Sequence, residues 1–222
     1  PNSDMVSEAV SVAKALGRDA PVKVVWTRED DIKGGRYRPM YFHTLKAGLD
    51  AQGNIVGWQH RIVGQSIVAN SPFQGMIKNG IDPTSVEGAN TLPYDIANLQ
   101  VDLHTTEVGV PVLWWRSVGS THTAYSTETF LDELAEAAGK DPVQFRKAML
   151  AKHPRHLKVL ELAAEKAGWG TPLPKGKGRG IAVHESFSSY VAQVAEVSVD
   201  ARGRLKVERV VCAVDCGLAI NP

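Results

Sequence analysis

The amino-acid sequence predicts an α+β fold, with mixed strand layers and packed helices. Two turn signals predict the strands, because alternating apolar and polar segments flank residues 50–54 and again residues 201–203. Helical spacing of apolar residues predicts helices at residues 4–16 and within the later block of residues 128–167. The 222 residues are 43% hydrophobic and 22% charged, which is enough for a buried core without disulfides.

The first half of the chain is predicted to be mostly strands after one helix. Asp4 is a candidate cap for that helix, and Gly17 ends it. The turn from Asp50 to Asn54 joins two alternating segments as a hairpin. Residues 64–95 hold scattered Gly, Pro and Asn and are expected to form a long irregular excursion, which is often functional. The expected strands are residues 22–26, 43–50, 55–63 and 98–106.

The second half is predicted to begin with helices and to end with strands. Phe130, Leu134 and Ala138 recur at steps of four, and Asp141 with Pro142 is an N-terminal signal for the next helix. Residues 157–167 predict a third helix. Residues 170–180 are rich in Gly, Pro and Lys and mark the best internal boundary. Strands are then expected at residues 181–183, 191–199 and 205–214.

Charge and motifs exclude several function classes. The net charge of +1 argues against nucleic acid or an anionic membrane as a partner, and no apolar run reaches the length of a membrane span. The sequence has no P-loop, GxGxxG, HExxH or GxSxG motif, and its histidines do not pair with cysteines at metal-ligand spacing. No metal-ligating residue is therefore predicted.

The two cysteines, Cys212 and Cys216, fall on one predicted strand. Side chains four residues apart in a strand lie roughly 13 Å apart, too far for a disulfide without a bend. The neighbouring apolar run of Val210 and Val211 predicts that both thiols are buried and reduced, with no metal bound. A metal-binding or redox pair is the alternative.

The segment from Val112 to Thr123 places an arginine and a glycine-bearing turn before hydroxyl residues at a helix start. Free backbone N–H groups and the positive helix end favour an anion such as phosphate, with Arg116 as a forked donor. The alternative is a capped helix in which Arg116 pairs with a carboxylate such as Glu128. A hydrolytic triad around Ser120 and His122 is disfavoured, because these side chains diverge at a helix start; Ser120 is expected to be a cap.

Several segments in fixed order point to a known family. An Arg-x-x-Gly turn at Arg116 precedes an acidic helix segment from Glu128 to Ala135 and an Asp-Pro-x-x-x-Arg segment ending at Arg146. Residues 195–200 read AEVSVD and residues 213–222 read AVDCGLAINP. Together with residues 8–30, these motifs resemble the large subunit of the xanthine dehydrogenase and aldehyde oxidase superfamily. The form WWRSVGSTH at residues 114–122 most resembles the isoquinoline 1-oxidoreductase beta-subunit and aldehyde dehydrogenase type.

The resemblance implies a molybdopterin-binding subunit of an oxidoreductase that hydroxylates N-heterocycles with water as the oxygen source. The cofactor would be molybdenum with a molybdopterin dinucleotide, and a small partner subunit would carry [2Fe-2S] clusters. Xanthine enzymes carry an aromatic residue in place of Val118, which argues against a purine substrate. The resemblance places Val118 and Gln100 beside the substrate. Its cofactor-binding residues are Arg116, Ser117, Val118, Gly119, Ser120 and Thr121.

The family's glycine-rich motif, its Gln-x-Glu-Gly segment and its Gly-x-Gly-Glu segment with the general-base glutamate are not in this sequence. We therefore expect an internal fragment with no catalytic residue of its own, inactive and without bound molybdenum when alone. The expected domains are residues 1–169, part of a first cofactor-binding domain, a linker at 170–180, and the start of a second domain at 181–222. The expected compartment of the parent protein is the bacterial cytoplasm, with the periplasm as the alternative.

Two other functions stay open at this stage. One is an aldehyde dehydrogenase of the same superfamily, with a small aldehyde as substrate. The other, of a different class, is a non-catalytic module for subunit interaction. The flanking sequence would separate the enzymes from the module, because only an enzyme needs the two missing motifs and a partner with cluster-binding cysteines.

Overall fold

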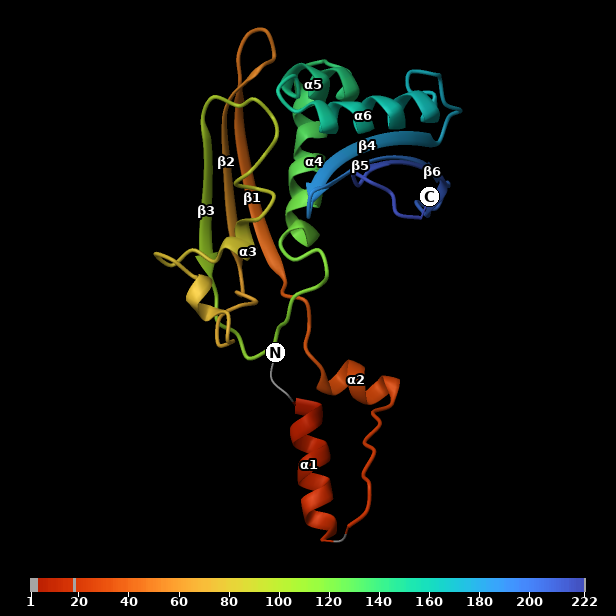
Figure 1. The fold of residues 1–222 in the computed structure, drawn as a ribbon. Coiled ribbons are helices and arrows are strands. Elements are labelled where there is room, and N and C mark those ends of the chain that lie inside the picture. The colour runs from red at the N-terminus through yellow and green to blue at the C-terminus, as the bar shows by residue number, and fades with distance from the viewer. Residues whose placement is uncertain (1–3, 18, 222) are drawn as a thin grey trace.

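The computed structural model describes residues 4–17 and 19–221 and confirms the α+β class, with two three-stranded sheets and helices between and around them (Figure 1). The first sheet has the order β1-β2-β3 and the second β4-β5-β6. The elements are α1 (Asp4–Leu16), α2 (Arg28–Gly34), β1 (Tyr41–Leu49), β2 (Ile55–Gly64), η1 (Gln74–Met76), α3 (Pro83–Val86), β3 (Leu99–Thr105), α4 (Ser120–Ala137), α5 (Pro142–Met149), α6 (Pro154–Ala167), β4 (Lys177–Ser186), β5 (Ser189–Val199) and β6 (Leu205–Asp215).

The first sheet confirms the predicted hairpin. β1 and β2 pair antiparallel, and the Asp50 carboxylate closes the turn by accepting the N–H groups of Gln52 and Asn54 at 2.9 and 2.8 Å. β3 pairs parallel with β2, which requires a crossover, and the irregular excursion of residues 65–98 supplies it. The excursion packs α3 against the end of the sheet where β2 and β3 finish.

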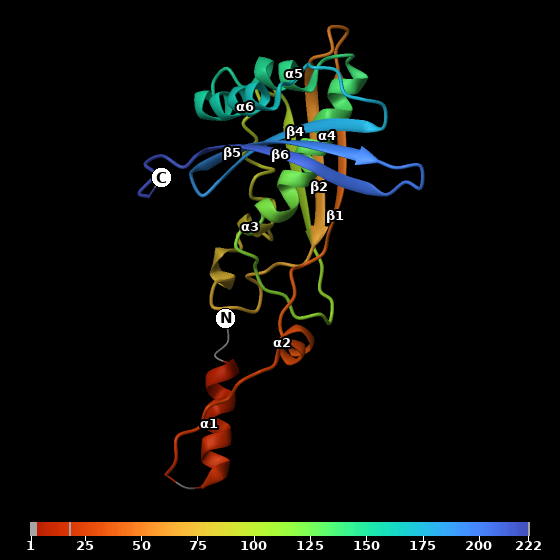
Figure 2. The same ribbon diagram turned by 90° about the vertical axis from the view of Figure 1, so that its right-hand side faces the viewer.

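The second sheet is an antiparallel meander, and α6 covers it (Figure 2). Its strands cross the direction of the first sheet in that view. β4 begins at Lys177, inside the segment expected to be a linker, and α6 packs on the strands that follow. The helix before residues 170–180 thus shares a core with the strands after them, while the division into two domains stays a prediction.

α4 lies between the two sheets and is held there by a buried ion pair. Arg146 of α5 is fully buried, and its Nε donates to the Glu128 carboxylate of α4 at 3.0 Å. The hydroxyl of Tyr94 donates to the same carboxylate at 2.6 Å, and the Val183 N–H of β4 donates at 2.8 Å. Burial raises the pKa of Glu128, and these donors together with the arginine charge oppose that shift. One carboxylate therefore joins α4, α5, β4 and the excursion.

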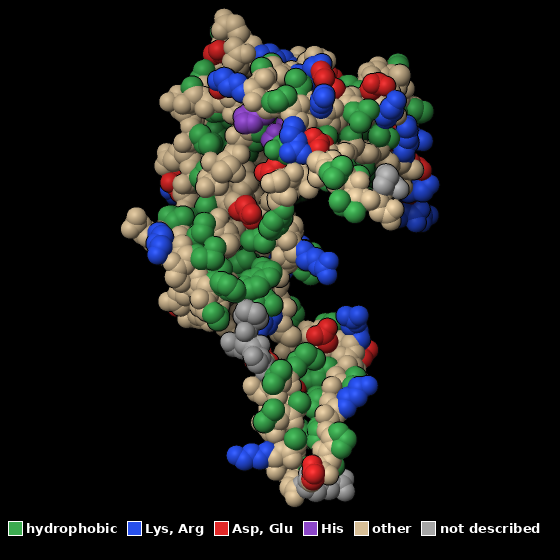
Figure 3. Space-filling model, in the orientation of Figure 1, with side chains coloured by type: hydrophobic (Ala, Val, Ile, Leu, Met, Phe, Trp, Pro, Cys, Tyr) green, Lys and Arg blue, Asp and Glu red, His purple; other side chains and the backbone are tan. Residues whose placement is uncertain are grey.

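The N-terminal segment forms an arm that leaves the rest of the molecule (Figures 1 and 3). α1 confirms the first predicted helix, but none of its residues is buried. The predicted strand at residues 22–26 is wrong: the chain is extended there without a strand partner, and Trp26 donates to Glu8 of α1 at 2.8 Å. Its alternation arises from packing beside a helix. Among the described residues, no helix is long and apolar enough to cross a membrane.

The predicted burial of the two cysteines is also wrong. Cys212 and Cys216 are both exposed and unpaired. In β6, Cys212 shares its outward row with Val210 and Val214, which are 50% and 57% exposed, while Ala213 on the opposite row is buried. Cys216 lies beyond the last residue of the strand. Val210 and Cys212 therefore face the uncovered side of the sheet, while Val211 points to the opposite side and packs against the core.

Candidate functional site

The predicted cofactor turn at residues 116–119 leads directly into α4. Val118 has a φ of 49°, a region that β-branched residues rarely adopt. Gly119 has no room for a side chain, since an added Cβ would lie 2.1 Å from the carbonyl oxygen of Thr84 in α3. The turn therefore packs closely against α3, and this contact fixes its backbone conformation.

The helix start is capped differently from the prediction. The N-cap is Gly119, and its N–H donates to the Glu87 carboxylate at 2.9 Å. Ser120, expected to be the cap, is instead the first helical residue and is buried. The prediction was wrong because a carboxylate from the distant excursion supplies the acceptor. The positive end of α4 therefore already faces an anion, and the Gly119 N–H is not free for a ligand.

Arg116 is exposed on the outer side of this turn. Its predicted alternative partner, Glu128, is buried and bound by Arg146, so that alternative is wrong. In the part of the chain that the structure describes, the Arg116 guanidinium makes no hydrogen bond or ion pair. The hydroxyls of Ser117 and Thr121 bond to each other one helical turn apart. Arg116 is therefore the charged donor at this turn that remains available.

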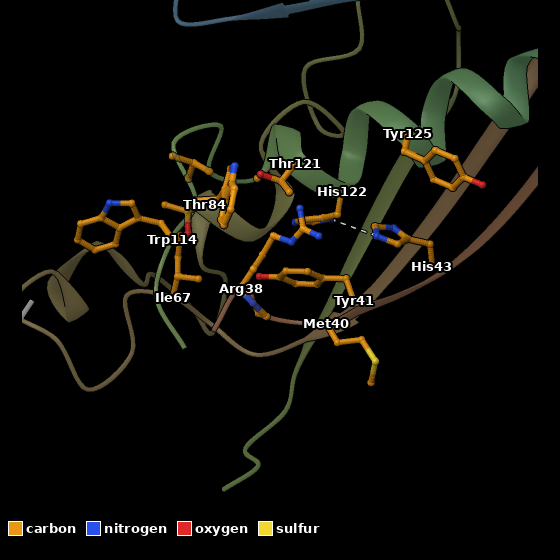
Figure 4. Close-up of a pocket in the computed structure, with 14 residues that line it drawn as sticks. Arg38, Met40, Tyr41, His43, Ile67, Thr84, Trp114, Thr121, His122 and Tyr125 are labelled. Atoms are coloured by element: carbon orange, nitrogen blue, oxygen red, sulfur yellow. Dashed lines mark hydrogen bonds between the residues drawn. The ribbon is translucent and has the colours of Figure 1, made fainter. Parts of the chain in front are cut away.

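A pocket of about 370 Å³ opens beside the turn, within the size range of small-molecule sites (Figure 4). Val118, Gly119 and Thr121 are the predicted site residues that reach it. Among the described residues, no carboxylate lines it, and Arg38 is its charged group, lying 5.5 Å over the Trp115 ring. We call it the aromatic pocket; its lining is Arg38, Pro39, Met40, Tyr41, His43, Ile67, Thr84, Trp114, Trp115, Val118, Gly119, Thr121, His122 and Tyr125.

Gln100 does not join the other predicted substrate residue, Val118. It lies near the start of β3, paired in register with Gln59, and lines a separate depression of the first sheet. Its amide donates to Asp102 at 2.9 Å. The aromatic pocket lies at the opposite end of this sheet, where Tyr41 begins β1. The structure thus separates the two residues.

Three histidines form a hydrogen-bonded chain that ends in the aromatic pocket. His60 Nε2 lies 2.8 Å from His43 Nδ1, and His43 Nε2 lies 3.1 Å from His122 Nδ1. The ring of Tyr41 stacks on His122 with centroids 3.7 Å apart, as Figure 4 shows. Tyr41 can lie this way because its strand partner is Gly64, where a Cβ would meet the tyrosine ring at 2.3 Å.

The three rings are neutral near pH 7. Burial is the main cause that lowers the pKa of each, to about 4 for His60 and about 3 for His122. In the described part of the chain, no group of three or more His, Cys, Asp or Glu side chains is arranged to hold a metal ion. The three histidines are linked to one another by hydrogen bonds.

Sequence reasoning missed this chain and the residues around it. One signal was present: the predicted hairpin turn fixes the register, which brings His43 close to the His60 position across two strands. The contribution of His122 had no such signal, since it depends on how α4 packs on β1. Arg38 and Glu87 lie in segments without periodicity, and their positions follow only from the tertiary fold.

The buried histidines predict a stability that falls in mild acid. Unfolded histidine has a pKa near 6.5, so unfolding takes up protons below that pH while the folded rings stay neutral. The free energy of unfolding should fall from about pH 6.5 downwards, with a loss on the order of 2 kcal/mol from His60 by about pH 5. Denaturant titrations between these pH values measure it. His60→Gln should flatten the slope, and the exposed His104→Gln should not; equal slopes for all three proteins would contradict the account.

Curated relatives match nearly the whole chain. The beta subunit of isoquinoline 1-oxidoreductase from Brevundimonas diminuta is 29% identical over 97% of the chain, and a nicotinate dehydrogenase subunit from Pseudomonas putida is 29% identical over 99%. A membrane-bound aldehyde dehydrogenase of Gluconacetobacter polyoxogenes is 26% identical over 100%. The chain spans 28%, 20% and 32% of these relatives' own lengths.

Solved structures share the fold. Quinoline 2-oxidoreductase from Pseudomonas putida 86 matches 89% of this chain and 29% of its own with a TM-score of 0.58 and 17% identity. The aldehyde oxidoreductase from Desulfovibrio gigas matches 90% of this chain and 24% of its own with a TM-score of 0.54 and 18% identity. The resemblance predicted from the motifs is confirmed, since the family of molybdopterin cofactor-binding domains matches residues 3–150, more than half of the sequence. The chain belongs to this family of molybdopterin cofactor-binding domains.

Proposed function

We propose that this chain forms part of the cofactor and substrate wall of a molybdenum-dependent oxidoreductase that hydroxylates N-heterocycles with water as the oxygen source. The observation that carries the proposal is the aromatic pocket beside the Arg116 turn, with flat side chains and no carboxylate among its described lining. Relatives named for isoquinoline, nicotinate and quinoline support this substrate class.

The residues at the turn fit a phosphate-bearing cofactor through side chains. Arg116 is exposed, and a guanidinium offers forked donors to phosphate oxygens. Ser117 and Thr121 add hydroxyls beside it. The Gly119 N–H already donates to the Glu87 carboxylate, so this N–H is not part of the fit. When bound, the molybdopterin dinucleotide supplies the metal centre at which the substrate is oxidised.

This chain's own residues would orient and shield the substrate. Trp114, Trp115 and Tyr125 give the pocket apolar faces that exclude water and stack on a flat ring. Val118 has a left-handed backbone conformation, and the close approach of the neighbouring Gly119 to α3 keeps Val118 at a fixed position on the pocket edge. The proton acceptor of the reaction is expected from a glutamate in another segment, and electrons would leave through a small partner subunit with [2Fe-2S] clusters.

An aldehyde is the second candidate substrate, because relatives named aldehyde dehydrogenase and aldehyde oxidoreductase match over similar ranges. Dye reduction by the intact enzyme separates the two candidates. We expect quinoline or isoquinoline to be turned over with a higher kcat/KM than benzaldehyde, since the flat bicyclic ring fills the aromatic pocket better. Turnover of benzaldehyde alone would assign the enzyme to aldehydes.

The role of Arg116 predicts a specific loss in the intact enzyme. Arg116→Ala should weaken cofactor binding by roughly tenfold to a hundredfold, because a charge-assisted hydrogen bond contributes about 1.5–3 kcal/mol. The measurement is molybdenum per protein by elemental analysis, beside the melting temperature of cofactor-stripped protein. The melting temperature should barely move, because Arg116 is exposed.

Arg61→Ala is the matched control, since Arg61 is also exposed and lies on the first sheet with Asp102 as its partner. It should keep normal molybdenum content. Normal molybdenum content and activity in Arg116→Ala would rule out the cofactor role. A large drop in its stripped-state melting temperature would instead assign Arg116 a structural role.

A further inference from the structure

Arg38 lies in the segment just before β1, and the backbone around it is held in place. The Tyr37 N–H donates to the Pro111 carbonyl, and the Leu113 N–H donates to the Tyr37 carbonyl, each at 2.9 Å. Pro39 follows Arg38 and restricts the backbone of Arg38 to extended conformations. The segment of Arg38 is therefore fixed beside the chain that leads into the two tryptophans of the aromatic pocket.

The Arg38 side chain extends into the aromatic pocket, as Figure 4 shows. Its guanidinium carbon lies 5.5 Å from the centre of the Trp115 ring, a cation–π contact that restrains the side chain without using a hydrogen-bond acceptor. In the part of the chain that the structure describes, the guanidinium has no hydrogen-bond or ion-pair partner, and Arg38 is exposed. Its N–H donors are therefore available to a ligand.

The other polar side chains of the described lining are less available. The hydroxyls of Tyr41, Thr84 and Thr121 are hydrogen-bonded within the protein. The histidine rings are neutral, and their nitrogens are hydrogen-bonded to one another or buried. The hydroxyl of Tyr125 points away from Arg38 in Figure 4. Arg38 is thus the charged donor that a ligand entering this pocket meets.

The pocket combines a positive charge with flat apolar surface. The rings of Tyr41, Trp114 and Trp115 favour a flat aromatic ligand over a small inorganic anion, which would leave these surfaces in contact with water. A guanidinium is a forked donor that matches the two oxygens of a carboxylate. We propose that Arg38 is a specificity-determining residue that binds the carboxylate of a flat aromatic acid in the aromatic pocket. The identification of this acid as an N-heterocyclic substrate rests on the proposed function.

A matched pair of ligands tests the role of the charge. Quinoline-3-carboxylate and quinoline-3-carboxamide have nearly the same shape, and only the first is charged. Their affinities for the intact enzyme are measured by equilibrium dialysis without an electron acceptor, at a pH where the acid is ionised and the ring nitrogen is not. The wild type should bind the carboxylate about tenfold more tightly, a modest factor because Arg38 is exposed. Added salt should reduce this preference, since it screens exposed charges.

Three variants assign the preference to one side chain. Arg38→Gln keeps a planar polar end without the charge, so it should bind the two ligands equally. Arg38→Lys keeps the charge without the fork and should retain part of the preference. Arg36→Gln is the matched control, because Arg36 lies two residues earlier and pairs with Asp4 at 3.0 Å. It should keep the wild-type preference.

Several results would overturn the proposal. These are equal binding of both ligands by the wild type, binding of neither, or a preference retained in Arg38→Gln. Displacement of the carboxylate by an equal concentration of inorganic phosphate would also overturn it, because it would show a general anion site. The readout is binding without turnover, so a failure of the proposed function in the dye-reduction assay would leave it unchanged, and the two failures are distinguishable.

Discussion

The buried contact between Glu128 and Arg146 is the constraint on which the arrangement depends. A fully buried arginine is costly unless each donor is used, and this one donates to Glu128, to Asp132 and to the backbone of α4 and α5. Glu128 in turn accepts from Tyr94 and Val183, so its two oxygens orient α4 against the excursion and the second sheet. The N-terminal end of the same helix carries the predicted cofactor turn, residues 116–119, and His122. Glu128 and Arg146 belong to the segments that resemble the family, so part of this resemblance reflects a structural role: these residues fix the orientation of the helix that leads from the candidate site.

Local patterns predicted most of the regular elements. The hairpin turn at Asp50, the Asp141 cap and the periodicity of the later helices are signals that neighbouring residues supply, and the structure confirms these elements. The predicted strand at residues 22–26 was wrong because a chain segment that packs beside a helix can alternate apolar and polar residues as a strand does. The predicted burial of Cys212 was wrong because an apolar row on an edge strand has the same sequence pattern whether or not another surface covers it. Burial depends on the partner surface, which sequence periodicity does not contain.

Of the candidate site, the sequence indicated only the turn that precedes α4. Motif resemblance pointed to the segment from Arg116 to Thr121, and three of its residues reach the aromatic pocket. The prediction that Gln100 lies beside the substrate stays a prediction, and the structure places this residue in a separate depression of the first sheet, away from Val118. The histidine chain joins β1, β2 and α4, and Glu87 caps α4 from a segment without periodicity. Contacts of this kind arise from tertiary packing between segments far apart in the sequence.

A double-mutant cycle on Glu128 and Arg146 tests most directly whether this pair holds the arrangement together. The free energy of unfolding would be measured for wild type, Glu128→Gln, Arg146→Met and the double variant. Arg146→Met leaves the buried Glu128 carboxylate without its charged partner, and Glu128→Gln leaves the buried Arg146 with Asp132 as its remaining carboxylate; each change should cost roughly 3–5 kcal/mol. The double variant removes both charges, so it should be more stable than the sum predicts by about 3 kcal/mol. Costs that add to within about 0.5 kcal/mol would show that the two residues act independently and would contradict the account.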